Sequence, residues 1–425
     1  MYPNPQDVVP LIAGSTLEQY ETHAKNLVAA CRSGKQDAIP RWAAQWRATS
    51  QDLEAFARRT LVESDCALEA AQLVLAQVHG FDSWPAFAAH LDELGRAESS
   101  VSRFEAAAEA VIAGDLQTLE RLLHEQPELI RARSTRVHHS TLLHYAAANG
   151  VENYRQKTPP NAVDVANILL SAGAEVDAEA DMYGGGCTAL GLVATSIHPE
   201  RAGVQNALMQ CLIDHGAMID RPRVAGNNHT FITGCLANGR APAAEYLAAR
   251  GARLDLEGAA GLGRLDLVRD YFDADGRLKP TATPKQVDAA FGWACEYGRT
   301  GVVAFLLERG IPVGASVSHD GQTGLHWAAL GGHADVVSLL LDRHAPVGIV
   351  ERTYGGTPLS WALHGWTDPP YGTPRDRYYE VVARLVRAGA AVNERWFDED
   401  SEQTGFASAL RADGRMIAAL RGNVL

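Results

Sequence analysis

The segment DGQTGLHWAALGGHADVVSLLLDRHAPV, residues 320–347, decides the fold because both of its halves recur along the chain. The first half returns as STLLHYAAANG from Ser140, GCTALGLVATS from Gly186 and GGTPLSWALHG from Gly355. The second half returns as VANILLSAGAEVD, LMQCLIDHGAMID, AAEYLAARGARLD, VVAFLLERGIPVG and VVARLVRAGAAVN. Self-similarity of this kind indicates a stack of small units, none of which can bury its apolar face alone.

The repeated unit resembles the ankyrin repeat. The signature T-P-L-H-x-A-A is matched best at Thr323 to Ala329, and L-L-x-x-G-A at Leu306 to Gly310. The resemblance covers residues 101–396 at about the 33-residue ankyrin period, and it implies an all-α solenoid of about eight helix-turn-helix units. The units are expected to start near Phe104, Thr141, Thr188, Thr230, Leu256, Asp288, Thr323 and Thr357.

Each recurring position of the motif has a physical role. The Thr is expected to cap the first helix, and the following Leu and paired Ala provide a slim apolar face for the second helix. A Gly after the "LL" pair suits the left-handed conformation that ends the second helix. This position is occupied by Gly173, Gly216, Gly251, Gly310 and Gly389, and by His344 in one unit. The imidazoles of His144 and His326, in the T-P-L-H position, are expected to bridge backbone groups of neighbouring repeats.

Two flanking regions are predicted outside the repeat array. Residues 1–98 contain several amphipathic helical patterns and are interpreted as an N-terminal helical domain that covers the first repeat. After the acidic segment FDEDSEQT, residues 397–425 are predicted to provide a C-terminal capping helix.

Three units are longer than the period. Gly173 and Gly216 are 43 residues apart, and His344 and Gly389 are 45 apart, whereas Gly310 and His344 are only 34 apart. The extra residues fall between the two helices of units two, three and eight, near 151–162, 197–206 and 366–379. Insertions in repeat proteins tend to collect on one, often binding, face, although surface insertions also cost little and need no function.

Aromatic residues follow the T-P-L-H position in four units: Tyr145, Trp293, Trp327 and Trp361. One turn later the same helix face carries Asn149, Glu296, Tyr297 and His364. These residues are predicted to line a concave binding groove. The alternative is that the rings pack between neighbouring first helices as ordinary core.

Composition limits the classes of function. With 46% hydrophobic and 21% charged residues the chain is predicted to be a folded, soluble protein, and no apolar run approaches the ~18 residues that span a bilayer. The N-terminus lacks the features of a signal peptide, so we expect a cytoplasmic protein that does not bind membranes. A formal charge of −13 removes the attraction on which nucleic-acid binding depends, so no nucleic-acid partner is expected.

Cysteine and histidine patterns do not indicate a metal or nucleotide site. The six cysteines have no CxxC pair or zinc spacing and are predicted to be reduced and mostly buried, with a catalytic cysteine as the alternative. These are Cys31, Cys66, Cys187, Cys211, Cys235 and Cys295. His138 and His139 are adjacent and point in different directions. The stretch DMYGGGCTALG from Asp181 lacks the Lys-Ser/Thr of a phosphate-binding loop. We therefore predict no cofactor and no metal.

The function predicted from the resemblance is protein–protein interaction through the concave groove. The alternative is an ankyrin-fold enzyme or ligand sensor, with a small-molecule pocket between the groove and the insertions of repeats two, three and eight. Its acid–base candidates are Glu296, His364, Arg155 and His198. The predicted insertion contacts are Glu152, Tyr154, Arg155, Arg201, Trp366 and Asp368. The sequence does not indicate whether the protein catalyses a reaction. A structural spacer, with neither a binding nor a catalytic function, is a third possibility.

Overall fold

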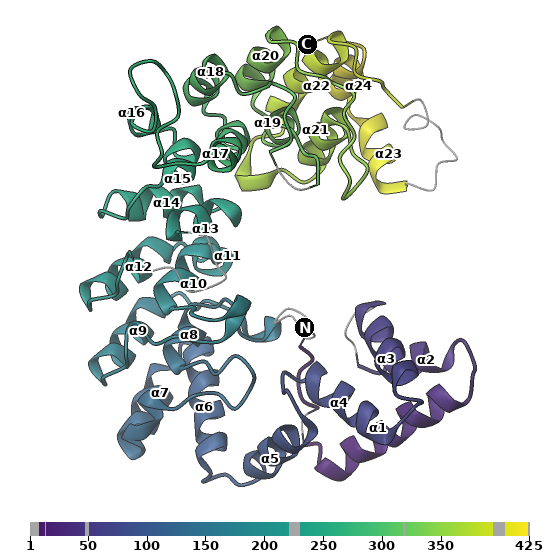
Figure 1. Cartoon of the computed structure of the whole chain (residues 1–425). Helices are drawn as coiled ribbons and strands as arrows, with labels where there is room; N and C mark the ends of the chain where they lie inside the picture. Colours follow the sequence, from purple (N-terminus) through teal and green to yellow (C-terminus); the bar gives the residue numbers. More distant parts are fainter. Residues whose placement is uncertain are drawn as a thin grey trace. The chain divides into compact units, whose positions relative to one another are not determined.

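A computed structural model describes residues 8–12, 14–46, 51–220, 230–317, 320–393 and 404–423. The described residues form helices with only isolated β-bridges between them, which confirms the all-α prediction. The chain divides into two compact units, Met1–Asn228 and His229–Leu425, and each is described by itself below (Figure 1).

The first unit begins with a separate group of N-terminal helices. These are α1 (Leu17–Arg32), α2 (Ala38–Ala44), α3 (Gln51–Glu63), α4 (Leu68–Val78) and α5 (Trp84–Leu94). They share a core in which the rings of Tyr20, Trp46 and Phe87 pack around the imidazole of His79. Ser83 caps α5 by accepting from the backbone N–H of Ala86, and a proline in the first turn completes the start of the helix.

A disulfide joins Cys31, near the end of α1, to Cys66, in the turn between α3 and α4. The prediction that all six cysteines are reduced is therefore wrong for this pair, because the folded chain brings together two thiols that are 35 residues apart in the sequence. The other four cysteines are free. Because structural disulfides are typical of oxidising compartments, the cytoplasmic localisation stays a prediction.

Reduction of the Cys31–Cys66 bond is expected to lower the free energy of unfolding of the first unit by about 2–4 kcal/mol, since the bond restricts the unfolded chain. Differential scanning calorimetry with and without dithiothreitol measures this effect. A variant with both Cys31→Ser and Cys66→Ser serves as the control and should not respond to the reductant. An equal response of the variant and the wild type would show that the bond contributes nothing.

The remaining helices of the first compact unit belong to the repeat array. Their paired helices are α6 (Ser100–Ala113) with α7 (Leu116–Glu125), α8 (Leu142–Ala146) with α9 (Ala162–Ser171), and α10 (Ala189–Thr195) with α12 (Gln205–Asp214). The 3₁₀ helix η2 (Pro127–Arg131) follows α7, and η4 (Met182–Gly184) precedes α10. The first repeat begins earlier than predicted. Its first helix, α6, is capped by Ser99, whereas the start of this repeat was expected near Phe104.

The second unit continues with the same pairing. Its repeat helices are α13 (Phe231–Ala237), α14 (Ala241–Ala248), α15 (Leu256–Gly261), α16 (Leu265–Arg269), α17 (Pro284–Glu296), α18 (Thr300–Glu308), α19 (Gly324–Leu330), α20 (Ala334–Asp342), α21 (Pro358–Thr367) and α22 (Arg377–Arg387). One predicted start is displaced: α17 begins at Pro284, before Asp288, because Thr283 forms a capping box with Gln286. Neighbouring first helices α17, α19 and α21 pack directly against one another (Figure 1).

The predicted motif roles are confirmed. The backbone N–H of Thr141 donates to Nδ1 of His144, whose Nε2 lies 3.1 Å from the carbonyl oxygen of Ala178 and 3.2 Å from that of Cys187. His326 makes the equivalent contacts with Thr323 and Gly356. The helix-ending glycines have φ values of 91–96°, and His344 adopts the same left-handed region at 61°.

The C-terminal region differs from the prediction of one capping helix. It forms two helices, α23 (Thr404–Ala412) and α24 (Gly414–Leu420), because the Asp413 carboxylate caps α24 by accepting from the backbone N–H groups of Arg415 and Met416. α24 packs on α22 and thereby covers the last repeat. The end of the predicted array at 396 and the acidic segment 397–403 lie outside the described residues. None of the described helices combines the length and the apolar character required to cross a membrane.

Candidate functional site

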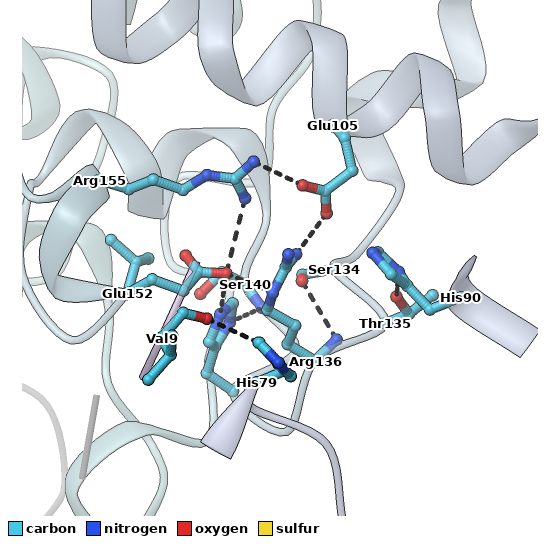
Figure 2. Close-up of polar contacts among 12 residues, drawn as sticks. Val9, His79, His90, Glu105, Ser134, Thr135, Arg136, Ser140, Glu152 and Arg155 are labelled. Atoms are coloured by element: carbon cyan, nitrogen blue, oxygen red, sulfur yellow. Dashed lines mark hydrogen bonds and ion pairs between the residues drawn. The ribbon is translucent and has the colours of Figure 1, made fainter. Parts of the chain in front are cut away.

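A buried ionic cluster lies between the N-terminal helices and the first two repeats (Figure 2). We define it as Glu105, Arg136, Glu152 and Arg155. Glu105 comes from α6 and Arg136 from the segment before α8. Glu152 precedes the 3₁₀ helix η3 (Asn153–Arg155), which includes Arg155 and lies in the insertion of the second repeat. Arg136 is 2% exposed and Glu152 is 1% exposed, so the cluster is closed to solvent.

The cluster pairs each guanidinium with both carboxylates. Arg136 donates through Nη1 to Glu105 at 2.6 Å, and its Nε lies 2.7 Å from Oε1 of Glu152. Arg155 places Nη2 at 2.7 Å from Oε2 of Glu105 and Nη1 at 3.6 Å from Oε1 of Glu152. Two positive and two negative charges therefore compensate one another in an interior where an unpaired charge would be very costly.

The electrostatic balance keeps all four groups ionised. Burial acts against the charged form of each carboxylate, but the guanidinium group of Arg136, joined by that of Arg155, lowers the pKa of both Glu105 and Glu152. In the same way burial opposes the charged guanidinium groups, while the two glutamates raise the pKa of Arg136 and Arg155.

Part of the polar surface of the cluster is unsatisfied. Within the described residues, Oε2 of Glu152 and the hydroxyl of Tyr145 have no hydrogen-bond partner although both are buried. The side chain of His138 lies beside them, with Nε2 3.5 Å from Oε1 of Glu152. Unsatisfied buried polar atoms carry a desolvation cost, so the stability of this region depends on all four charges remaining paired.

The predicted insertion contacts Glu152 and Arg155 are thus packed inward. Tyr154 is half-buried, and its ring lies 5.7 Å from the guanidinium carbon of Arg155. Arg155 also reaches the exposed Glu109 at 2.8 Å. With its guanidinium occupied by three carboxylates, Arg155 is positioned to hold the insertion on α6, a structural role.

The second insertion also folds back on its own repeat. It contains the short helix α11 (Ile197–Arg201). At the end of the insertion, Gln205 donates to the carbonyl oxygens of Val193 at 2.9 Å and Ser196 at 3.0 Å. His198 is half-buried, and burial followed by the charge of Arg201 lowers its pKa. Arg201 itself is exposed.

The predicted groove residues of the first unit are structural. Tyr145 is fully buried against the ionic cluster and belongs to the interior instead of an exposed groove. Asn149 donates to the carbonyl oxygen of Leu192 and to Oγ1 of Thr195 in the following repeat, and accepts from the hydroxyl of Tyr183. Its amide therefore ties two repeats together.

Aromatic side chains of the second unit are placed differently. Trp293 on α17 and Trp327 on α19 are half-buried, whereas Trp361 on α21 is only 8% exposed. The rings of Trp327 and Trp361 meet edge to face with centroids 5.1 Å apart. The half-buried Tyr297 donates its hydroxyl to the carbonyl oxygen of Leu236 at 2.5 Å. Trp361 is core, as the second alternative predicts, whereas Trp293 and Trp327 retain exposed surface and their place in a binding groove stays a prediction.

The remaining candidates of the second unit separate by exposure. Glu296 is buried, at 5% exposure, and its backbone carbonyl accepts from Nε2 of His333 at 2.7 Å. His364 and Asp368, near the end of α21, are exposed. The acid–base candidates are thus divided between the two units, with Arg155 and His198 in the first and Glu296 and His364 in the second.

The third insertion extends α21 and then turns back through the 3₁₀ helix η5 (Pro370–Gly372). The Trp366 ring in this insertion is buried. Arg375 caps the end of α21 by donating to the carbonyl oxygens of Trp366 and Thr367. Trp366 and Arg375 also line an open pocket of about 720 Å³ whose opposite wall comes from α23 and α24. This pocket lies beside the C-terminal helices and includes none of the predicted groove residues.

Sequence reasoning missed Glu105 and Arg136 of the ionic cluster. The sequence does contain a signal for Glu105. This residue lies three and seven positions before the buried Ala108 and Ile112, so it is on the same, inward face of the helix. Arg136 lies in a connecting segment without periodicity, and only the fold reveals its burial. Within the described ranges, no three His, Cys, Asp or Glu side chains come together in a way that could hold a metal ion.

Comparisons with known proteins address the repeat region. Residues 291–395 match a family model described as ankyrin repeats in three copies. A search of curated proteins gave no match. Among solved structures, the ankyrin repeat domain of human ASB11 is similar to this chain at 21% sequence identity and a TM-score of 0.34, over 68% of this chain and 99% of that domain.

Proposed function

We propose that this chain, whose residues 291–395 match a model of ankyrin repeats, is an ankyrin-repeat protein whose second unit binds a protein partner through an aromatic face. We define the aromatic face as Trp293, Tyr297, Trp327 and His364, from α17, α19 and α21. Ankyrin repeats generally mediate protein–protein interactions by presenting an extended surface made of equivalent positions in successive repeats. The proposal assigns this role to the equivalent first-helix positions of three neighbouring repeats.

The observation that carries the proposal is the partial exposure of Trp293 and Trp327. Both rings follow the same motif position on neighbouring helices, and both keep surface that the repeat stack leaves uncovered. Tryptophan and tyrosine dominate the energetic centres of protein interfaces, because a large rigid ring can be desolvated with little loss of conformational entropy. Trp361, buried behind Trp327, supports that ring edge to face.

The exposed His364 adds a polar group one turn beyond Trp361. Polar groups beside an aromatic centre are typical of the rim of an interface, where they fix orientation. No reaction is part of the proposal, because the candidate acid–base groups are divided between the two units and, in the second, Glu296 is buried whereas His364 is exposed.

Replacement of Trp327 with alanine is expected to weaken binding of the partner by roughly 2 kcal/mol or more, about thirtyfold, as for an aromatic group at the centre of an interface. Partners are first captured with the wild-type chain and identified by mass spectrometry, and their affinity for each variant is then measured by surface plasmon resonance. A Trp293→Ala variant provides an independent second test on α17.

The matched control is Tyr354→Ala, which removes an aromatic ring that is 81% exposed in the turn before α21 and lies outside the aromatic face. Circular dichroism must show that all variants are folded, since Trp327 also packs against the core. The proposal is wrong if the folded Trp327→Ala and Trp293→Ala variants retain wild-type affinity for every identified partner.

A further inference from the structure

The pocket beside the C-terminal helices has walls from three separate parts of the second unit. The insertion of the eighth repeat contributes Trp366 and Arg375, α22 contributes Tyr379, and the α23–α24 pair contributes Ala412, Asp413 and Arg415. Its volume of about 720 Å³ falls in the range of ~300–1,000 Å³ that is typical of small-molecule sites.

Two guanidinium groups are held in place around this pocket. The guanidinium carbon of Arg415 lies 4.2 Å from the ring centroid of Tyr379, and that of Arg375 lies 5.3 Å from the ring centroid of Trp366. The hydrogen bonds from Arg375 to the end of α21 use its Nε and Nη2, and within the described residues Nη1 makes no hydrogen bond. Stacking on an aromatic face fixes the plane of each guanidinium and directs its N–H edge away from the ring.

The acidic group in the pocket does not neutralise these arginines by direct pairing. Asp413 accepts two backbone N–H groups through Oδ1 and the hydroxyl of Tyr379 through Oδ2 at 2.7 Å. Partial burial opposes its ionisation, but these hydrogen bonds, followed by the nearby charge of Arg415, lower the pKa of Asp413. Within the described residues, neither Arg375 nor Arg415 forms an ion pair with any carboxylate.

Apolar surface lies next to the two cations. Ala409 and Ala412 of α23 form one side of the pocket, and Trp366 borders it with little exposed surface of its own. The indole N–H of Trp366 is buried near the hydroxyl of Tyr379 and has no partner at ordinary hydrogen-bond distance among the described residues. The site therefore combines donors for an oxyanion with a surface for an apolar body.

We propose that this pocket binds a small organic anion, in which a carboxylate or phosphate contacts Arg375 and Arg415 and a flat apolar body lies against Ala409 and Ala412. Guanidinium groups recognise both kinds of oxyanion through charge-assisted hydrogen bonds. The net charge of −13 repels free anions from most of the surface, so anion binding requires a local arrangement such as this one. The site shares no residue with the aromatic face, and its function is independent of the protein interaction proposed above.

The experiment titrates the full chain with phenyl phosphate and with benzoate by isothermal titration calorimetry. We expect saturable binding with a dissociation constant of about 1 mM or tighter for at least one of the two. The preferred probe identifies the oxyanion as phosphate or carboxylate. Benzyl alcohol, which lacks the charge, and inorganic phosphate, which lacks the apolar body, should each bind at least about fivefold more weakly.

Replacement of Arg415 with glutamine is expected to weaken binding of the preferred probe about tenfold, because one charge-assisted contact is lost. Ala412→Glu, which places a negative charge on the pocket wall, should weaken it at least as strongly. Arg421→Gln is the matched control: it removes the same charge just after α24 but does not line the pocket, and should change the affinity less than about twofold.

The proposal would be overturned by the absence of saturable binding of either aromatic anion. Equal weakening by Arg415→Gln and Arg421→Gln would overturn it as well, because it indicates non-specific attraction. Binding of inorganic phosphate as tight as that of phenyl phosphate would also contradict it, because the apolar walls would then contribute nothing. Circular dichroism of each variant distinguishes loss of the site from loss of the fold.

Discussion

Replacement of Arg136 with methionine is expected to lower the free energy of unfolding of the first unit by about 3–5 kcal/mol, the usual cost of removing one partner from a buried ion pair. Methionine keeps much of the side-chain volume, so the loss is electrostatic and not mainly a cavity effect. Glu152 would retain only the longer contacts of 3.6 Å with Arg155 and 3.5 Å with His138 while staying buried. Urea unfolding followed by circular dichroism measures the change.

A second variant shows whether the loss comes from an unpaired charge. Combining Arg136→Met with Glu152→Leu removes both members of one pair and leaves Glu105 paired with Arg155 at 2.7 Å. The double variant should therefore be more stable than the sum of the two single losses predicts, by at least about 1 kcal/mol. Arg96→Met, at an exposed pair with Asp92, is the surface control and should cost less than about 1 kcal/mol. Additive single losses would contradict a coupled cluster.

Acidification from pH 7 to pH 5 is expected to destabilise the first unit by several kcal/mol, because it contains three buried neutral histidines. Burial, the largest cause, lowers the pKa of His79, His90 and His144 from 6.5 to about 4. Below pH 6.5 the unfolded chain binds protons that the folded chain does not, so stability falls as the pH falls toward 4. Each histidine contributes roughly 2 kcal/mol of loss by pH 5.

The ionic cluster adds a separate loss at lower pH. The pKa values of Glu105 and Glu152 are lowered in the folded state. Their contribution to stability is present above the pKa of the unfolded carboxylates and disappears as the pH falls through the folded values. The histidine effect therefore comes first on acidification, and the carboxylate effect follows below about pH 4.5.

Urea unfolding at pH 7, 6 and 5 measures the histidine effect. His90→Asn is the test variant, because asparagine can still bond to Oγ1 of Thr135, which lies 2.7 Å from Nδ1 of His90, but does not titrate. The slope of stability against pH should be smaller in this variant than in the wild type. A free energy of unfolding that is constant between pH 7 and pH 5 would contradict the assignment of these three histidines.

The repeat positions were predictable because their signals are local. Thr323 and His326 act on the backbone within one turn, and the conformation after each "LL" pair depends on the residue at that position, as the φ of 91° at Gly310 shows. The displaced start of α17 has the same explanation. The capping box of Thr283 and Gln286 overrides the repeat register, and it too can be read from neighbouring residues.

The candidate sites were predictable only in part. The departure from the repeat period located the insertions near 151–162, 197–206 and 366–379. It did not predict the direction in which their side chains point. Arg155 turns inward to Glu105, a partner 50 residues away, whereas Arg375 turns back to its own helix. Sequence spacing contains no information about such distant partners, because the same side chain can be exposed or buried depending on what packs over it.

The sequence by itself determined the all-α repeat architecture, since helix caps, left-handed turns and apolar faces depend on neighbouring residues. Only the tertiary structure decided which polar groups are buried together, that Cys31 and Cys66 are joined, and that Tyr145 is interior while Trp327 keeps an exposed edge. The physical reason is that burial and electrostatic pairing are properties of contacts between distant segments. Those contacts form when the repeats stack. They place Arg155, predicted as a binding residue of an insertion, in a buried structural ion pair with Glu105.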